Sequence, residues 1–269
     1  MKNFKTLCVA ACVAMVGLSS CLGDGKTVTK GTDVPTVVRN VTFEDFSTKK
    51  LMVTPYGYLS TADAYLVDYE DGDCVLIDFT YDSSDPNNDG SAARGYSYVT
   101  LDQVVEPVND WPCNSITSND TTLTDPSVEQ PLTYAISSLQ KAAYVDGYIF
   151  LPSAFKGKET RQTVWRMAAN RYAEPEWVKG KRTFHMWMRA QITYDGDPNT
   201  KETDMVKTNA YYIKDVIDGW NTYMQNNCET EDSYYVLIHY IRSINQNGEP
   251  EWAETEQLQF MVPLKEDEY

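Results

Sequence analysis

The chain has 269 residues, and its 39 acidic against 23 basic side chains give a formal net charge of −16 at pH 7. So acidic a surface repels phosphate backbones and anionic lipid headgroups, which argues against binding to nucleic acid or to a membrane through a basic patch. The length is enough for two modest domains, and the 19 Tyr, 8 Phe and 6 Trp favour strands over helices.

The first twenty residues have the composition of a secretory leader. Lys2 and Lys5 precede an apolar run, residues 7–18, that is too short to span a bilayer. Residues 18–21 (Leu-Ser-Ser-Cys) resemble the bacterial lipoprotein signal, which implies cleavage before Cys21 and a lipid anchor on Cys21. The alternative is an N-terminal core helix that buries Cys21. Because the leader removes two lysines and no acid, the net charge of −16 becomes −18 in the mature chain.

The segment after Cys21 is predicted to be a lipidated tether over residues 21–49. Gly, Thr, Asp and Lys are frequent there and Pro35 interrupts them, a composition typical of a flexible spacer. The apolar residues 34–41 could instead be a first strand. We therefore expect a lipid-anchored protein of the bacterial cell envelope, in the outer membrane rather than the inner one, with the periplasmic or surface face left open.

Residues 50–115 are predicted to form a small all-β domain, either a barrel or a meander. Short strand patterns cover residues 51–60, 64–69, 74–81 and 96–101, and Asp71-Gly72 is a tight-turn dipeptide. The Asn, Asp, Ser, Thr and Pro of residues 109–131 are typical of a linker, so the junction between the domains is placed there.

Residues 116–269 are predicted to form a second all-β domain with one short helix. Strand patterns fall at residues 143–151, 163–172, 183–194, 234–241 and 256–262. Apolar residues at a 3.6-residue spacing predict a helix from about Lys214 to Gln225 whose apolar face covers a sheet. Gly219 inside this helix costs roughly 1 kcal/mol relative to alanine.

These features together resemble the NigD-like lipoproteins of Bacteroidetes. The matching segments are the lipoprotein signal ending at Cys21, residues 72–79 (Gly-Asp-Cys-Val-Leu-Ile-Asp-Phe) leading to residues 98–101, and residues 143–149 (Ala-Tyr-Val-Asp-Gly-Tyr-Ile). Residues 235–240 are similar to a late strand of that family. The resemblance implies a lipidated leader, a small OB-like barrel, a C-terminal β-sandwich and no established catalytic residues. It also suggests an immunity or interaction role.

Three cysteines remain once the leader is removed and Cys21 carries the lipid. Cys74 lies in a strand pattern and is predicted to be a small buried side chain. Cys113 and Cys228 lie in loop-like sequence, and the envelope permits oxidation, so they are a possible disulfide. The alternative is two reduced thiols.

Two tryptophans are the strongest candidates for exposed, ligand-binding aromatic residues. Trp177 and Trp252 each follow a Glu-Pro-Glu segment in polar sequence, whereas the other tryptophans fit a core. Exposed aromatic rings stack on sugars or anchor a protein partner.

Metal and cofactor sites are not predicted. His185 and His239 are the two histidines of the chain and could be neighbours in one sheet, but no HxH or HExxH spacing supports a metal site. Residues 85–90 match the first half of a calcium loop and lack its final Glu, and Asp195, Asp197 and Asn199 form a second partial match.

No GxSxG elbow, P-loop or Gly-rich dinucleotide turn is present, so catalysis is not predicted. The sequence favours a membrane-anchored binding module for a protein partner, with an immunity-type role as one form of it. The alternatives are a glycan-binding accessory lipoprotein that uses its aromatic residues and, third, a metal-assisted hydrolase.

Overall fold

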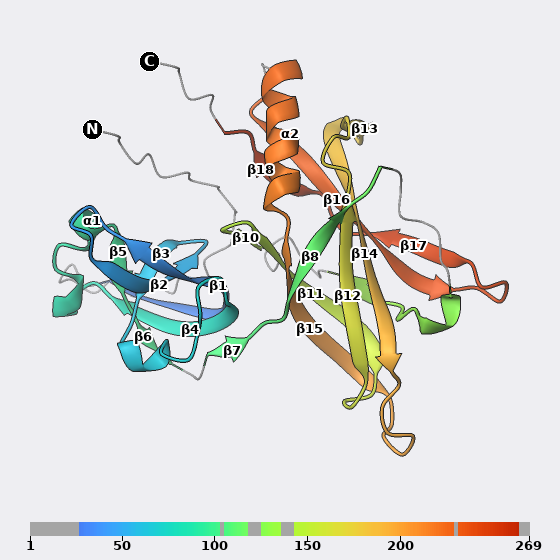
Figure 1. Cartoon of the computed structure of the whole chain (residues 1–269), viewed down its shortest axis with the longest axis horizontal. Coiled ribbons are helices and arrows are strands. Elements are labelled where there is room, and N and C mark those ends of the chain that lie inside the picture. Colours follow the sequence, from blue (N-terminus) through green and yellow to red (C-terminus); the bar gives the residue numbers. More distant parts are fainter. Residues whose placement is uncertain (1–26, 103–104, 118–124, 136–142, 229–230, 264–269) are drawn as a thin grey trace. The chain divides into compact units, whose positions relative to one another are not determined.

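The computed structural model describes residues 27–102, 105–117, 125–135, 143–228 and 231–263, so Cys21 lies outside the described residues. These residues form two compact units built mainly of strands (Figure 1). The N-terminal unit contains the described residues up to Asp110 together with Ala143–Asp146, and the C-terminal unit contains the others. Within the described residues, no helix has the length and apolar character needed to cross a membrane.

The N-terminal unit is a barrel-like sheet with the strand order β5-β3-β2-β1-β4-β6, to which β7 adds by pairing with β4 (Figure 1). Its neighbouring strands are antiparallel except β3 and β5, which run parallel. The unit also holds the short strand β10 (Ala143–Val145). The bounds are β1 (Val28–Thr42), β2 (Thr48–Thr54), β3 (Gly57–Ser60), β4 (Cys74–Asp82), β5 (Tyr96–Tyr98), β6 (Thr100–Leu101) and β7 (Glu106–Pro107).

Strand β1 is the longest of this unit and shows that the prediction of a tether over residues 21–49 was too long. Its first half pairs with β4 and its second half with β2, and the register shifts between Gly31 and Val34. A side chain at Gly31 would collide with the Phe79 ring, so glycine permits this close approach. Val34 and Val38 are buried in the core of the unit, which is why this segment is folded and not a spacer.

Residues 64–69 are not the predicted strand. The chain forms a 3-10 turn there, η1 (Asp63–Tyr65), and places Leu66 in the core with 2% of its surface exposed. Two further short helical turns precede β5, namely η2 (Pro86–Asn88) and α1 (Ser91–Arg94). The predicted strands at residues 51–60 and 74–81 are confirmed as β2, β3 and β4.

The C-terminal unit is organised around a large sheet with the order β11-β15-β8-β12-β14-β16-β17 (Figure 1). Strands β9, β13 and β18 add to it by pairing with β11, β14 and β16, respectively. The bounds are β8 (Asp110–Ser115), β9 (Tyr134–Ala135), β11 (Tyr148–Gly157), β12 (Gln162–Ala169), β13 (Glu176–Val178), β14 (Lys181–Tyr194), β15 (Thr203–Tyr212), β16 (Ser233–Ile244), β17 (Pro250–Glu254) and β18 (Leu258–Met261).

Part of the predicted linker belongs to this sheet. Strand β8 pairs in parallel with β12, with Cys113 opposite Met167. Farther along, the turn η3 (Pro126–Val128) leads to Glu129, whose buried carboxylate accepts hydrogen bonds from Arg189 and Gln191 on β14. Residues 110–115 and 125–130 are therefore structural parts of the unit.

The predicted helix is confirmed as α2 (Lys214–Asn227), and it buries Val216, Ile217, Trp220 and Met224. The Trp220 ring stacks on Phe184 of β14, with 4.5 Å between centroids and 11° between planes. A side chain at Gly219 would place its Cβ 2.5 Å from the backbone oxygen of Arg171. The glycine that weakens the helix thus allows it to pack closely on the chain beside it.

Candidate functional site

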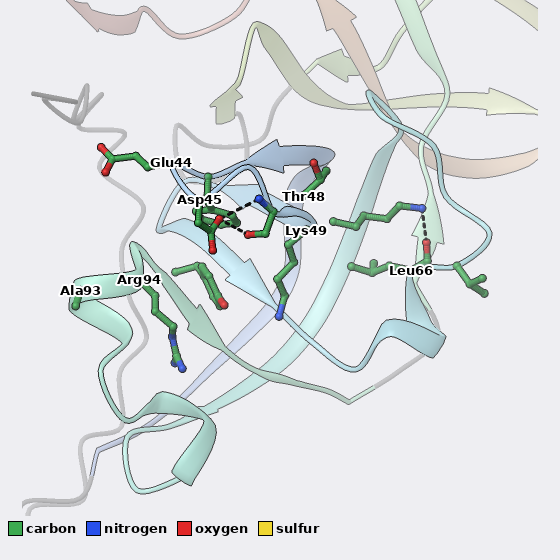
Figure 2. A pocket seen from close by; sticks show the side chains of 12 residues that line it. Glu44, Asp45, Thr48, Lys49, Leu66, Ala93 and Arg94 are labelled. Atoms are coloured by element: carbon green, nitrogen blue, oxygen red, sulfur yellow. Dashed lines mark hydrogen bonds between the residues drawn. The ribbon is translucent and has the colours of Figure 1, made fainter. Parts of the chain in front are cut away.

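A pocket of about 960 Å³ opens in the N-terminal unit beside the loop that joins β1 to β2 (Figure 2). Its volume lies in the range of small-molecule pockets in proteins. We call it the β1–β2 pocket. It is lined by the loop and the start of β2, by the turn after η1, and by α1 with the start of β5, that is, by Phe43–Asp45, Ser47–Lys50, Leu66, Val67, Ala93, Arg94 and Tyr96.

Two cations meet over one aromatic ring in this pocket. The Lys49 ammonium lies 5.0 Å and the Arg94 guanidinium 5.2 Å from the centroid of the Tyr96 ring. Both distances are within cation–π range, and Arg94 also donates to the backbone oxygen of Asn87. Figure 2 shows Lys49 and Arg94 approaching from different elements, while Glu44 extends away from them.

The bases of the N-terminal unit are concentrated at this pocket, where three of them stand beside two acids, Glu44 and Asp45. Residues 27–110 contain fifteen acidic and five basic side chains, and three of those five bases line the pocket. Lys50 is engaged by the backbone oxygens of Leu66 and Tyr69, which leaves Lys49 and Arg94 as the cations that lie against the ring. An anionic group is therefore attracted here more than elsewhere on the unit.

The β1–β2 loop itself is held in shape by Asp45. One of its carboxylate oxygens accepts hydrogen bonds from the Ser47 amide (2.9 Å) and the Ser47 hydroxyl (2.6 Å). These bonds hold the pKa of Asp45 below its usual value. At the tip of the loop, Phe46 is 89% exposed and has a left-handed backbone with φ of 63°, which is uncommon for a bulky side chain.

A comparison with known protein families shows which domain the N-terminal unit is similar to. The family model of the lipoprotein OB domain matches residues 32–105, which include most of β1, the strands from β2 to β6 and the whole β1–β2 pocket. Residues 32–105 are therefore similar to the OB domain of lipoproteins. The resemblance inferred from the sequence is confirmed for this domain, and the domain begins well before residue 50, where the sequence placed its start.

Solved structures share the fold over most of the chain. An uncharacterised protein from Parabacteroides merdae matches with a TM-score of 0.70 and 18% identity, over 86% of this chain and 99% of that one. A "Putative lipoprotein" from Bacteroides fragilis matches with a TM-score of 0.51 and 9% identity, over 90% of this chain and 100% of that one. A NigD-like immunity protein from Bacteroides caccae has a TM-score of 0.47 and 9% identity, over 88% and 99% of the two chains. No curated protein matches the sequence significantly.

The two tryptophans that were predicted to be exposed, Trp177 and Trp252, differ in how exposed they are. Trp177 on β13 is 63% exposed, but the Arg182 guanidinium lies 4.8 Å from its ring centroid and covers one face. Trp252 on β17 lies opposite Ile241 and is half-buried. The expectation of exposure is met by Trp177 alone.

Of the two readings left open for Cys113 and Cys228, a disulfide or two reduced thiols, the structure has the second, and Cys74 is also a free thiol. Cys113 lies on β8 opposite Met167, whereas Cys228 directly follows helix α2 as its C-cap residue. The two cysteines therefore belong to different elements. Burial raises the pKa of Cys113 and of Cys74 to about 12, which keeps these thiols protonated.

The two histidines are neighbours in one sheet, as the sequence suggested. Strands β14 and β16 run in parallel, and the His185 Nδ1 atom lies 2.8 Å from the His239 Nε2 atom. The Trp187 ring stacks on His239, with centroids 5.3 Å apart and planes at 13°. Burial and the neighbouring His185 lower the pKa of His239. Among the described residues, no group of three or more His, Cys, Asp or Glu side chains is placed to hold a metal.

The two partial calcium loops use their oxygens for internal hydrogen bonds. Asp85 accepts from the Asn87 amide at 2.8 Å and caps η2, and Asp197 accepts from the Asn199 amide at 2.8 Å. Asp195 pairs with Lys158 and Arg161 at 2.7 and 2.6 Å, and these partners lower its pKa. In the structure these loops form turns and surface ion pairs.

The β1–β2 pocket was missed by reasoning from the sequence. Its residues come from three separate segments, and no motif marks them. One signal was present: Lys49 and Lys50 form a basic pair, and Arg94 is the next basic residue after them, in a stretch where acids outnumber bases three to one. A search for bases concentrated in an acidic domain would have selected this pair.

Proposed function

We propose that this chain is a lipid-anchored envelope protein that acts by binding, and that its OB domain holds an acidic segment of a protein partner. The lipoprotein family model and the sequence of residues 18–21 support the anchor on Cys21. The observation that carries the binding role is the exposed Phe46 at the tip of the β1–β2 loop, next to a pocket that gathers three of the domain's bases.

The exposed Phe46 ring and the basic pocket beside it fit one interface. A fully exposed aromatic ring in an unfavourable left-handed backbone costs free energy in the unbound protein, and such costs persist where they serve a function. Aromatic residues and Arg are the side chains that dominate binding energies between proteins. Lys49, Arg94 and Tyr96 then supply the complement to an acidic side chain of the partner.

A glycan ligand is less well supported by the geometry. Stacking of a sugar needs an open aromatic face, and Arg182 already covers one face of Trp177. An immunity-type role is one form of protein binding, but the NigD-like immunity protein is too distant in structure to argue from.

The experiment compares capture of envelope proteins by the tagged chain and by pairs of matched variants. Phe46→Ser and the double variant Lys49→Glu/Arg94→Glu change the proposed surface. Tyr172→Ser removes an exposed ring from the C-terminal unit, and Lys30→Glu reverses an exposed charge on β1 outside the pocket. We expect the partner to be retained by the wild type and both controls.

The surface variants should lose the partner. A central aromatic or Arg contact is worth about 2 kcal/mol or more, so binding should weaken roughly 30-fold or more. Equal capture by all five proteins would refute the assignment of the surface. Signal on a glycan array that depends on Lys49 and Arg94, with no protein retained, would replace the protein partner by an acidic glycan.

A further inference from the structure

Four titratable side chains form a row across one face of the C-terminal sheet. The row runs from Glu176 on β13 through His185 on β14 and His239 on β16 to Glu254 on β17. Its two inner nitrogens, His185 Nδ1 and His239 Nε2, lie 2.8 Å apart, which is a hydrogen-bond distance. Each outer nitrogen faces a carboxylate oxygen, at 3.7 Å for Glu176 and at 3.5 Å for Glu254.

We propose that the two histidines form a site for one shared proton, and that this site makes the C-terminal unit sensitive to acid. One added proton completes the contacts of the row, and a second added proton breaks the contact at its centre. The site therefore has three states, in which the two rings together carry two, three or four N–H groups.

The neutral pair leaves one contact of the row unfavourable. Two neutral imidazoles carry two N–H groups on four nitrogens, and one of these N–H groups lies between the rings. A single N–H then remains for two carboxylates, so one outer lone pair faces a negative oxygen. The His185 Nε2 atom is buried and makes no hydrogen bond within the described residues, so it gains most from an added proton.

The first added proton removes this mismatch. The three N–H groups then serve one contact between the rings and one contact each with Glu176 and Glu254. The positive charge lies between two carboxylates, and hydrogen bonds between charged groups are the stronger kind. The Trp187 ring, stacked on His239 with 13° between the planes, also favours a cation beside it.

The second added proton destroys the contact between the rings. Both inner nitrogens then carry hydrogens that point at each other across 2.8 Å, so the rings must turn apart. Burial and the neighbouring His185 lower the pKa of His239, so the second step lies below the usual histidine value of about 6.5. Coupled groups of this kind titrate as a pair, in two separate steps.

The charges that face the pair come from the strands on either side of it. The charged groups that act on His239 are His185, Glu254 and Glu176. The bases of the same face, Arg189 on β14 and Arg166 opposite it on β12, lie beyond Trp187 as seen from the pair. Arg189 is also bound by the carboxylate of Glu129. The row is thus a local arrangement of two imidazoles and two carboxylates.

The stability of the unit should therefore fall in acid by an amount that the pair sets. Below about pH 6.5 the unfolded chain binds two protons at these histidines, whereas the native pair binds one until its second step. Since the unfolded state binds one proton more, the unfolding equilibrium constant rises about tenfold for each pH unit that is lost in this window. This assignment is independent of the proposed function, because the β1–β2 pocket and the histidine row belong to different units.

The first test follows the imidazole proton resonances by NMR from about pH 8.5 to about pH 4.5. It uses the chain without a histidine tag, so that its two histidines are the only imidazoles present. We expect both histidines to shift together in a first step and again in a second, more acidic step. Glu176→Gln and Glu254→Gln should each weaken binding of the first proton roughly two- to fivefold, as for an exposed ion pair.

Asp197→Asn is the matched control, because it removes an exposed carboxylate from the loop that follows β14. It should leave both steps unchanged. A loss of proton affinity as large as that in Glu176→Gln would overturn the proposal, because it would indicate a diffuse effect of the acidic surface. Two independent titrations, one for each histidine and both at the usual histidine value, would overturn it as well.

The second test compares urea unfolding of the wild type and of His185→Gln/His239→Gln at about pH 6.5 and about pH 5.5. The double variant keeps every carboxylate, so the effect of the other titrating groups cancels in the comparison. The unfolding equilibrium constant should rise up to about tenfold more in the wild type. Equal acid sensitivity of the two proteins would contradict the proposal. Circular dichroism verifies the folding of each variant, and the wild-type titration decides by itself where a variant does not fold.

Discussion

The ion pair between Glu129 and Arg189 offers the sharpest test of how the C-terminal unit is held together. Both side chains are buried, with 4% and 8% of their surface exposed, and Gln191 also donates to the Glu129 carboxylate at 2.8 Å. Glu129→Ala removes the acceptor of both donors and leaves the Arg189 guanidinium without this carboxylate. Loss of one partner of a buried pair costs about 3–5 kcal/mol, because a charge stays in a place that cannot solvate it.

A surface pair of the same unit provides the comparison. Lys214 and Asp218 are 52% and 55% exposed and lie one helical turn apart on α2. Exposed pairs of this kind contribute about 0.5 kcal/mol or less, because water screens both charges. At roughly 2–4 °C per kcal/mol for a unit of this size, Glu129→Ala should lower Tm by about 10 °C and Asp218→Ala by about 1 °C.

The assay is thermal and urea unfolding, followed by far-UV circular dichroism. The double variant Glu129→Met/Arg189→Met should recover most of the lost stability, because both charges then leave the interior together. Equal losses for Glu129→Ala and Asp218→Ala would refute the reasoning. Such a result would mean that residues 125–130 are not packed on β14 and that the predicted linker was correct there.

Three further outcomes are expected from the sequence and the structure. Gly219→Ala should destabilise the protein despite the better helix propensity of alanine, because the added Cβ meets the Arg171 backbone oxygen; an increase in Tm would contradict that contact. Alkylation under denaturing, non-reducing conditions should modify Cys113 and Cys228 completely, whereas a mass that retains two unmodified cysteines would indicate a bridge. An alkynyl fatty acid should label wild-type cells and not cells with Cys21→Ala, and equal labelling would exclude the anchor at this position.

The elements that the sequence predicted well are those whose own side chains form the core. Helix α2 carries its apolar residues at a helical spacing, and β14 places the core residues Phe184, Met186 and Met188 at every second position. These patterns depend on neighbours in the sequence, so a reader of the sequence can find them. The sheet neighbourhood of His185 and His239 was anticipated for the same reason, since both lie in clear strand patterns.

The elements that were missed depend on pairing with distant parts of the chain. Strand β8 has mainly exposed, polar residues and is a strand because its backbone pairs with β12, more than fifty residues later. The first half of β1 is also polar, and its pairing with β4 makes it part of the sheet. Backbone hydrogen bonds leave no mark on the amino-acid composition, so a polar strand cannot be distinguished from a spacer by its residues.

The acidity of the chain also sets how its proposed OB surface should respond to salt. A net charge of −16 repels an acidic partner at long range, and the Debye length of about 10 Å at 0.1 M salt screens that repulsion first. Contacts inside the β1–β2 pocket are shorter and partly shielded from water, so Lys49 and Arg94 lose their attraction only at higher salt. Affinity for the partner should therefore rise from low to moderate ionic strength and fall beyond it. A steady fall from the lowest salt would mean that the partner meets a basic surface elsewhere, and a steady rise would mean that Phe46, not charge, provides the contact.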